Sequence, residues 1–292
     1  MIKGFISLLL ALSMLLSPLT ARKVARQPAE GGVRVSYGAE KSNVMDIYYP
    51  DDMGDAVDVV FLIHGGAWMF GDQTMFFDHA MEAAAKGYVG VTVDYSKFSD
   101  GATALDMNEE LFQACKTLKT LLERNGKRPH KMVVVGHSSG AHLALLYSYT
   151  HYQDSPIPIA FVTACSSPSD FLTPDQGKTV MERSRYLLCT ALTGTEISRV
   201  TEKIGGKYAD AMAAVTPYDR VTAQVPPTLL AHGTADSWVP YNNSPRLYEK
   251  LQSVGVPTEL LIFEGANHFL GHEPGTVERI EETMLAWAER YL

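Results

Sequence analysis

The sequence lacks several features that would assign it to a special class of protein. Its 292 residues contain three cysteines at irregular spacing, which form neither a disulfide framework nor a zinc-binding pattern. A single disulfide between Cys165 and Cys189 is compatible with the sequence. Basic residues number 25 against 33 acidic ones, and the net charge of −8 disfavours nucleic acid or an anionic membrane as a partner. Glycine and proline show no repeat, which excludes a fibrous protein. Because 46% of the residues are hydrophobic, the chain can bury a core and is not intrinsically disordered.

Long apolar runs are also scarce, and the one candidate for membrane contact lies at the start of the chain. In residues 1–21, Lys3 precedes an almost unbroken apolar run from Phe5 to Leu16, and Pro18 follows it. This order is typical of a secretory signal peptide. An uncleaved membrane anchor is the alternative, but a spanning helix needs about 20 apolar residues and this shorter run favours cleavage. We therefore expect a secreted or periplasmic protein, a mature domain over 22–292, and no stable membrane insertion.

The body of the chain alternates short apolar runs with amphipathic segments. Continuous β-branched runs predict buried strands at 57–63, 88–93, 131–135, 159–164, 228–231 and 258–263. Periodic or capped segments predict helices at 77–86, 105–124, 139–149, 241–254 and 276–291. Residues 33–49 alternate in hydropathy and predict an antiparallel edge hairpin. The fold class is therefore α/β, with a mostly parallel central sheet flanked by helices.

One part of the chain departs from this alternation. Residues 166–226 have the least regular pattern and several prolines. We interpret them as a small cap inserted after the sixth strand, with helices at 179–192 and 196–208. Because no linker separates the cap from the rest, we expect one domain with an insertion and not two domains.

The first chemical motif is a glycine-flanked serine at a strand-to-helix turn. The strand at 131–135 leads into Gly136-His137-Ser138-Ser139-Gly140, and a helix follows. Such a turn lifts the serine hydroxyl clear of the backbone, and small residues must flank it because the chain is crowded there. The N-terminus of the next helix supplies free N–H groups to an oxyanion. We predict that Ser138 is the catalytic nucleophile.

A serine nucleophile needs a general base, and the base needs a carboxylate to orient it. Asp236 and His268 each follow a predicted strand, so both belong at the same sheet edge as Ser138. Asp170 and Asp219 are the rival acids. His272 is the rival base, whereas the remaining histidines lie in glycine-containing turns, on the nucleophile helix or away from this edge; these are His64, His79, His130, His137, His142, His151 and His232.

A glycine-rich loop completes the motif set. His64-Gly65-Gly66-Ala67-Trp68 comes directly after the strand at 57–63. Successive glycines let backbone N–H groups turn into a site. Acyl transfer needs at least two such donors for the developing oxyanion. We predict the N–H groups of Ser139, Gly66 and Ala67 as these donors.

Together these four motifs resemble the α/β-hydrolase fold, and within it the HGG-type, BD-FAE-like esterases: carboxylesterases, acetyl or feruloyl esterases and arylformamidases. The resemblance covers roughly 33–292, and Ala67 stands where related lipases carry a third glycine. It implies a serine esterase that needs no metal or organic cofactor. Aromatic residues beside the motifs are expected to line the substrate pocket, namely Trp68, Phe171, Trp238 and Phe269.

The leading hypothesis is an exported hydrolase of small or aromatic carboxylic esters, including acetyl or feruloyl groups linked to carbohydrate. An arylformamidase is the first alternative, although export argues against an activity that is usually intracellular. A small serine peptidase is the second, but no added domain would select peptides. A non-catalytic binding module is the third, and the complete set of motifs argues against it. The sequence leaves the oligomeric state open.

Overall fold

The computed structural model describes residues 31–173, 178–198, 207–270 and 274–292. Within them, one eight-stranded sheet has the order β1-β2-β4-β3-β5-β6-β7-β8. β1 pairs antiparallel with β2, and β2 antiparallel with β4; every other neighbouring pair is parallel. The strands are β1 (Gly32–Ser36), β2 (Val44–Tyr48), β3 (Ala56–Ile63), β4 (Val89–Val93), β5 (Arg128–His137), β6 (Ile159–Cys165), β7 (Thr228–Gly233) and β8 (Thr258–Phe263).

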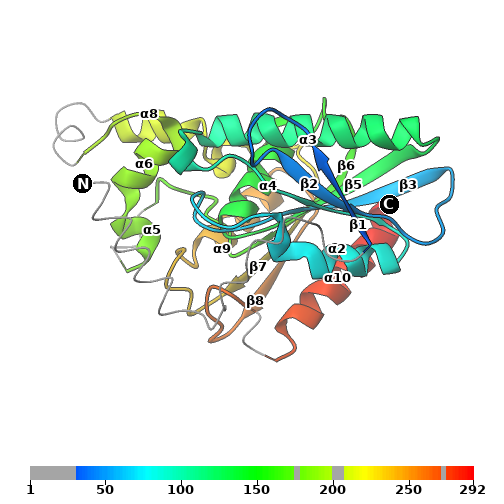
Figure 1. Cartoon of the computed structure of the whole chain (residues 1–292). Coiled ribbons are helices and arrows are strands. Elements are labelled where there is room, and N and C mark those ends of the chain that lie inside the picture. Colours follow the sequence, from blue (N-terminus) through cyan, green and yellow to red (C-terminus); the bar gives the residue numbers. More distant parts are fainter. Residues whose placement is uncertain (1–30, 174–177, 199–206, 271–273) are drawn as a thin grey trace.

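Helices cover both faces of the sheet, and α2 and α10 lie below it in the view of Figure 1 while α3 lies above. Their bounds follow from amphipathic segments that end at polar or glycine positions. The α-helices are α2 (Phe77–Ala85), α3 (Ala104–Arg124), α4 (Ser139–Thr150), α5 (Val180–Arg183), α6 (Arg185–Thr193), α8 (Lys207–Ala213), α9 (Asn243–Ser253) and α10 (Thr276–Tyr291). Three short 3₁₀ helices are η1 (Gln73–Phe76), η2 (Phe98–Asp100) and η3 (Pro217–Arg220).

The sheet separates two hydrophobic cores. Alternate residues of each strand point to opposite faces, so Phe61 of β3 joins the core with α3, α4 and α9, while Leu62 joins the core with α2 and α10. α4 is buried around nearly its whole circumference, because the sheet, α3 and η3 enclose it. This burial fixes the turn that begins α4, and with it the residue that precedes the helix.

The strands, the five long helices and the 33–49 hairpin lie where the sequence predicts them, with ends shifted by a few residues. One prediction for the cap was wrong. The helix expected at 179–192 is broken at Ser184 into α5 and α6, because Ser184 has φ of −100° and ψ of 7°, which depart from helical geometry. The N–H groups of Val180 and Met181 donate to the carbonyls of Ser237 and Trp238 and so tie the start of α5 to a different loop. Of the helix expected at 196–208, residues 196–198 are not helical, 207–208 belong to α8, and 199–206 lie outside the described residues.

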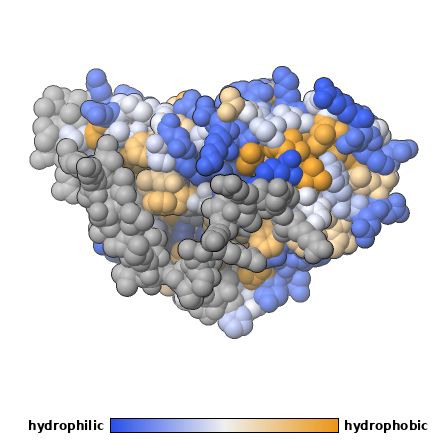
Figure 2. All heavy atoms as spheres, in the orientation of Figure 1, coloured by the Kyte–Doolittle hydropathy of each residue, from blue (hydrophilic) through white to orange (hydrophobic). Residues whose placement is uncertain are grey.

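The structure holds no disulfide among its three cysteines, all of which it describes, so the Cys165–Cys189 bond does not form. The predicted signal peptide lies outside the described residues, and no described helix is long and apolar enough to cross a bilayer. In Figure 2, hydrophilic residues cover much of the rim, and apolar residues gather in patches, one of them beside β1 and β2. The exposed Val33 of β1 belongs to this edge of the sheet.

Candidate active site

The nucleophile turn is so tight that two positions accept only glycine. Ser138 joins β5 to α4 with φ of 56° and ψ of −124°, a strained conformation for a residue with a side chain. A Cβ atom on Gly136 would lie 2.3 Å from the carbonyl oxygen of Gly140. A Cβ on Gly140 would lie 2.2 Å from the carbonyl oxygen of Ile63. The N–H of Ser138 donates to the carbonyl of Cys165, which anchors the turn to β6.

Ser138, His268 and Asp236 meet at the carboxyl ends of β5, β8 and β7. The Oγ of Ser138 lies 2.8 Å from Nε2 of His268, and Nδ1 of His268 lies 2.7 Å from Oδ2 of Asp236. An ionised carboxylate only accepts hydrogen bonds, so Nδ1 of His268 carries the proton there. Nε2 is then free to accept the hydroxyl proton of Ser138. This is the arrangement that activates a serine hydroxyl for attack.

The carboxylate of Asp236 accepts more than the bond from His268. His232 lies 3.1 Å away and donates from Nε2, and its Nδ1 is held by the hydroxyl of Ser244 at 2.7 Å. The N–H groups of Trp238 and Val239 donate to Oδ1 at 2.8 and 2.9 Å. Burial alone would raise the pKa of Asp236, but the bonds from His232 and His268 outweigh burial and lower the pKa below its ordinary value. Asp236 therefore stays ionised throughout the physiological range.

The backbone of His268 is also held in place. Nε2 of His137 and the hydroxyl of Ser166 both donate to the carbonyl oxygen of His268, at 2.8 and 2.9 Å. Burial, and secondarily the nearby imidazole of His268, lower the pKa of His137 to about 4. His137 is thus neutral at pH 7 and serves as a fixed donor. Its role here is to position the loop that carries His268.

The glycine-rich loop after β3 turns sharply at three successive residues. Gly66, Ala67 and Trp68 have φ of 127°, 54° and 60°. A Cβ on Gly66 would lie 2.0 Å from the carbonyl oxygen of Phe70, so the close approach requires glycine there. Left-handed conformations at the other two cost energy and persist only where the surroundings impose them. This loop ends within the same cavity as Ser138.

A buried hydrogen bond between side chains imposes that conformation. The indole N–H of Trp68 donates to Nδ1 of His142 at 3.1 Å, and Nε2 of His142 lies 2.7 Å from the carbonyl of Val215, to which it donates. Both ring nitrogens of His142 are therefore committed to one neutral tautomer. Burial lowers the pKa of His142 to about 4. His142 thus connects the glycine-rich loop to α4 and to the segment before η3.

The base of the same loop is fixed by a polar cluster. His64 is fully buried, with its Nε2 3.0 Å from Oδ1 of Asp94 and its ring stacked on Tyr95. The hydroxyl of Tyr95 donates to the carbonyl of His64 at 2.8 Å, and Lys97 pairs with Asp94. Burial would raise the pKa of Asp94, but His64 and Lys97 lower it overall. The cluster accordingly holds the strand end from which the loop departs.

A small cavity of about 50 Å³ lies beside the hydroxyl of Ser138. Its walls come from the glycine-rich loop, from α5 and α6, and from the loop after β7; they include Ala67, Trp68, Met181 and Trp238. Two of the four aromatic residues expected at the pocket are therefore here. Phe171 is instead buried behind them, packed on the rings of Trp68 and His142. Phe269 is 42% exposed and lies on the other side of His268, with its ring 6.3 Å from Trp238.

The rival candidates are engaged elsewhere or lie outside the described residues. The carboxylate of Asp170 is bound to Arg246 at 2.8 Å, and Asp219 lies in η3. His272 falls within the segment that the structure does not describe. Three supporting residues were not assigned to the site from the sequence: His232, Ser166 and His142. The spacing of His232 and Asp236 within one short loop could have indicated their contact, whereas no local signal marks the others.

The site has no metal-binding geometry among its described side chains. The one described group with suitable ligand spacing is His79, Glu82 and Glu281, which belong to α2 and α10 and do not contact Ser138. The groups around Ser138 are an imidazole, a carboxylate that already accepts four hydrogen bonds, and backbone N–H groups. This set is suited to acyl transfer without a metal.

The chain is similar to known esterases over most of its length. The family model described as BD-FAE matches residues 45–251. Isoprenylcysteine alpha-carbonyl methylesterase ICME of Arabidopsis thaliana is 25% identical over 246 residues, which cover 80% of this chain and 55% of that protein. The chain thus spans about half the length of this curated relative.

Solved structures show the same fold. Esterase B of Lactobacillus rhamnosis superimposes with a TM-score of 0.77 at 16% identity and covers 98% of this chain and 95% of that one. A truncated carbohydrate esterase from gut microbiota has a TM-score of 0.71 at 18% identity, with coverage of 90% and 99%. Because the BD-FAE model matches well over half of the residues, the chain belongs to the BD-FAE family and has the α/β-hydrolase fold of these esterases.

Proposed function

We propose that the protein is a serine esterase that hydrolyses carboxylic esters through Ser138, His268 and Asp236. The observation that carries this proposal is the continuous chain of two short hydrogen bonds from the serine hydroxyl to the carboxylate. The esterases among its relatives support the same reaction class. No step requires a metal or an organic cofactor.

In the first half of the proposed reaction, His268 removes the proton of Ser138 as the serine oxygen attacks the ester carbonyl. The N–H groups of Gly66, Ala67 and Ser139 donate to the resulting oxyanion. Ser139 is the first residue of α4, and the first N–H groups of a helix have no partner within it. When the tetrahedral intermediate collapses, His268 returns the proton to the leaving alcohol, and the acyl group stays on Ser138.

In the second half, a water molecule gives its proton to His268 and attacks the acyl-serine. The same N–H groups hold the second oxyanion, and the intermediate collapses to the free acid as His268 returns the proton to Ser138. The ionised Asp236 stabilises the imidazolium in both halves. Loss of one oxyanion donor typically lowers kcat by about 10²–10³.

The size of the cavity beside Ser138 favours a small acyl group. At about 50 Å³ it is larger than the share of liquid volume of one water molecule, roughly 30 Å³. An acetyl group suits this space, and a feruloyl group would require the side chains of Met181 and Trp238 to move. The alcohol portion, which includes the carbohydrate of an acetylated sugar, would extend into solvent. We therefore place acetyl esters ahead of aromatic acyl esters.

The reaction is tested with p-nitrophenyl acetate and a fluorophosphonate probe. Ser138→Ala should abolish turnover, and mass spectrometry should find the probe on Ser138 of the wild type. Ser148→Ala is the matched control, because this buried serine lies on the same helix away from the turn and should leave turnover unchanged. Full turnover by Ser138→Ala would refute the proposal, and labelling of any other serine would refute the assignment.

Acyl selectivity is tested with acetyl, butyryl, octanoyl and feruloyl esters. Met181→Ala enlarges the cavity and should raise the ratio of butyryl to acetyl turnover several-fold. Met181→Leu conserves volume and should leave this ratio close to that of the wild type. A wild-type preference for octanoyl or feruloyl esters would contradict the assignment of this cavity to the acyl group.

We also propose that residues 1–21 direct export and are then removed. The support is the order of one basic residue, an apolar run and a proline. Expression of the full chain with recovery of a mature product from the exported fraction would support this. An intact N-terminus on the purified protein would refute the cleavage.

A further inference from the structure

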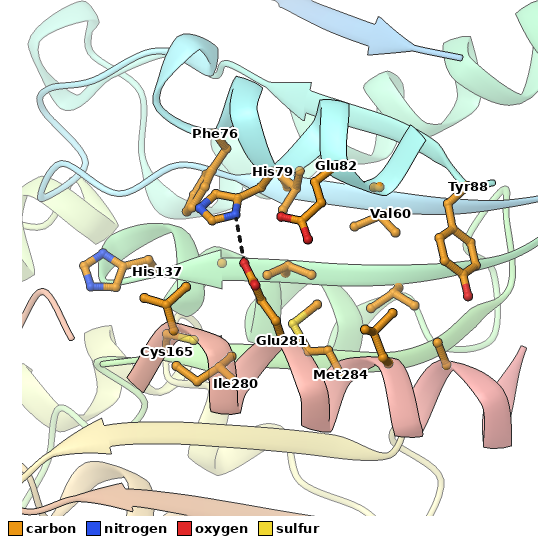
Figure 3. Close-up of a pocket in the computed structure, with 18 of the residues that line it drawn as sticks. Val60, Phe76, His79, Glu82, Tyr88, His137, Cys165, Ile280, Glu281 and Met284 are labelled. Carbon is orange, nitrogen blue, oxygen red and sulfur yellow. Dashed lines mark ion pairs between the residues drawn. The ribbon is translucent and has the colours of Figure 1, made fainter. Parts of the chain in front are cut away.

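A second and larger hollow lies on the face of the sheet between α2 and α10. It encloses about 330 Å³, within the range of small-molecule sites. Its floor is formed by β3, β5 and β6, including Val60, Val133 and Phe161, and its walls by the two helices. Figure 3 shows His137 at one end and Tyr88 at the other, with the strands running between them. We name this hollow the α2–α10 groove.

The α2–α10 groove is long, narrow and almost wholly apolar. In the sheet register, Val89, the neighbour of Tyr88, pairs with Val59, which pairs with Met132 of β5. His137 lies five residues after Met132, and at a rise of about 3.3 Å per residue this makes the groove roughly 17 Å long. A fully extended chain advances about 1.2 Å per bond, so roughly fourteen bonds span this length. These dimensions match one extended hydrocarbon chain.

Polar groups gather at one place on the rim. The ligand atoms of His79, Glu82 and Glu281 lie within 4.8 Å of one another, and His79 pairs with Glu281 at 3.5 Å (Figure 3). Lys86, which pairs with Glu82, is the ammonium that faces these two carboxylates. Burial raises the pKa of Glu281, and the neighbouring Glu82 raises it further. Glu278 raises it as well, so three carboxylates gather near this rim against Lys86 and His79. The rim thus carries an excess of negative charge, which a cationic or uncharged head group complements and an anionic one does not.

The α2–α10 groove is separate from the cavity that contains Ser138. Ser138 and Trp238 line that cavity and do not line the groove. His137 and Phe269 line the groove and do not line the cavity. The two hollows therefore have no lining residue in common. An occupant of one does not have to displace an occupant of the other.

We propose that the α2–α10 groove binds a single hydrocarbon chain of up to about fifteen carbons that carries a cationic or uncharged head group at the His79–Glu281 rim. The floor strands bury the chain, and the two carboxylates face the head group. This site is distinct from the proposed esterase site and does not depend on ester cleavage. Its ligands are single-chain amphiphiles and not ester substrates.

The test is isothermal titration with octyl-, decyl- and dodecyltrimethylammonium below their micellar concentrations. We expect one site per chain and an affinity that rises about tenfold for each two added methylenes, as burial of methylene groups requires. Dodecyl maltoside should bind, whereas dodecyl phosphate should bind at least tenfold more weakly than the ammonium compound. Affinity independent of chain length, or several equivalent sites, would overturn the proposal.

Two variants with matched controls locate the site. Val60→Phe fills the floor and should weaken binding of the dodecyl compound at least tenfold, whereas Val33→Phe on the exposed edge strand should not change it. Met284→Gln makes the wall polar without changing its length much, and should weaken binding about threefold. Its control is Met81→Gln, an exposed methionine of α2 outside the groove. Equal effects of variant and control would refute the location.

Ser138→Ala separates this proposal from the proposed function. This variant should bind dodecyltrimethylammonium as tightly as the wild type while it fails to hydrolyse esters. If Ser138→Ala retains esterase activity but Val60→Phe loses binding, the proposed function fails and the groove proposal stands. If Ser138→Ala loses binding as well, the two hollows are one site and the groove proposal is wrong.

Discussion

The two hollows of this protein share one loop but are built from opposite chemistry. On the Ser138 side, the side chains of Ser138, His268 and Asp236 hold one another by directional hydrogen bonds, and the cavity is about 50 Å³. On the other side, the α2–α10 groove offers about 330 Å³ of mostly apolar wall. The first geometry orients reacting atoms, and the second buries apolar area with little orientation. The comparison shows that the size of a pocket does not by itself identify the candidate active site, since Ser138 lines the smaller of these two hollows.

The largest difference between the two hollows is expected when the carboxylate of Asp236 is replaced by an uncharged amide. Asp236→Asn should lower kcat by about 10⁴-fold, because an amide favours the wrong tautomer of His268. Groove binding should not change. The measurement is kcat for p-nitrophenyl acetate, and Asp219→Asn, the rival acid, should retain wild-type kcat. A large loss in Asp219→Asn with none in Asp236→Asn would reverse the assignment.

The next largest effect concerns the nucleophile turn, which places Ser138 and whose Gly136 also lines the α2–α10 groove. Gly136→Ala places a Cβ 2.3 Å from a backbone oxygen, so the turn must shift and turnover should fall about 100-fold or more. Gly126→Ala is the matched control: its φ is 72°, but no atom lies within 4 Å of the added Cβ, and the cost is about 1–2 kcal/mol of backbone strain. Activity assays and thermal melts distinguish the two. Wild-type turnover in Gly136→Ala would show that the turn tolerates movement.

Acid should lower the free energy of unfolding through His142, the residue that holds the glycine-rich loop. In the folded protein its pKa is about 4, whereas the ordinary value of about 6.5 holds in the unfolded chain. Below pH 6.5, His142 therefore binds a proton in the unfolded chain but stays neutral in the folded one. The stability that His142 contributes above pH 6.5 is lost as the pH falls toward 4. The loss is about 3 kcal/mol from this residue. Urea unfolding at several pH values should show this loss. His142→Gln should reduce the dependence of the free energy of unfolding on pH, and the dependence that is left should come largely from His137.

The smallest effect tests whether the two hollows communicate. Dodecyltrimethylammonium at about 100 times its Kd should raise Tm by about 5 °C, because it binds the folded chain. The same occupancy should change the rate on p-nitrophenyl acetate less than twofold. A competitive loss of rate would instead show that the groove forms part of the ester site.

Local sequence patterns were sufficient to predict the architecture and the central chemistry. Buried β-branched runs marked each parallel strand, and the carboxyl ends of such strands share one edge. Because Ser138, Asp236 and His268 each follow such a strand, this rule predicts that they lie close together. Local patterns did not predict the break in the cap, where the backbone of Ser184 leaves helical geometry between α5 and α6.

The sequence by itself determined the sheet, the order of the strands along the chain and the three residues at its edge, because each follows from periodicity and spacing along neighbouring residues. Only the tertiary structure decided that His142 holds Trp68, that His232 holds Asp236, and that α2 and α10 stand far enough apart to leave a groove. These features depend on contacts and helix separations between segments that no local pattern relates. Packing of the whole chain sets them.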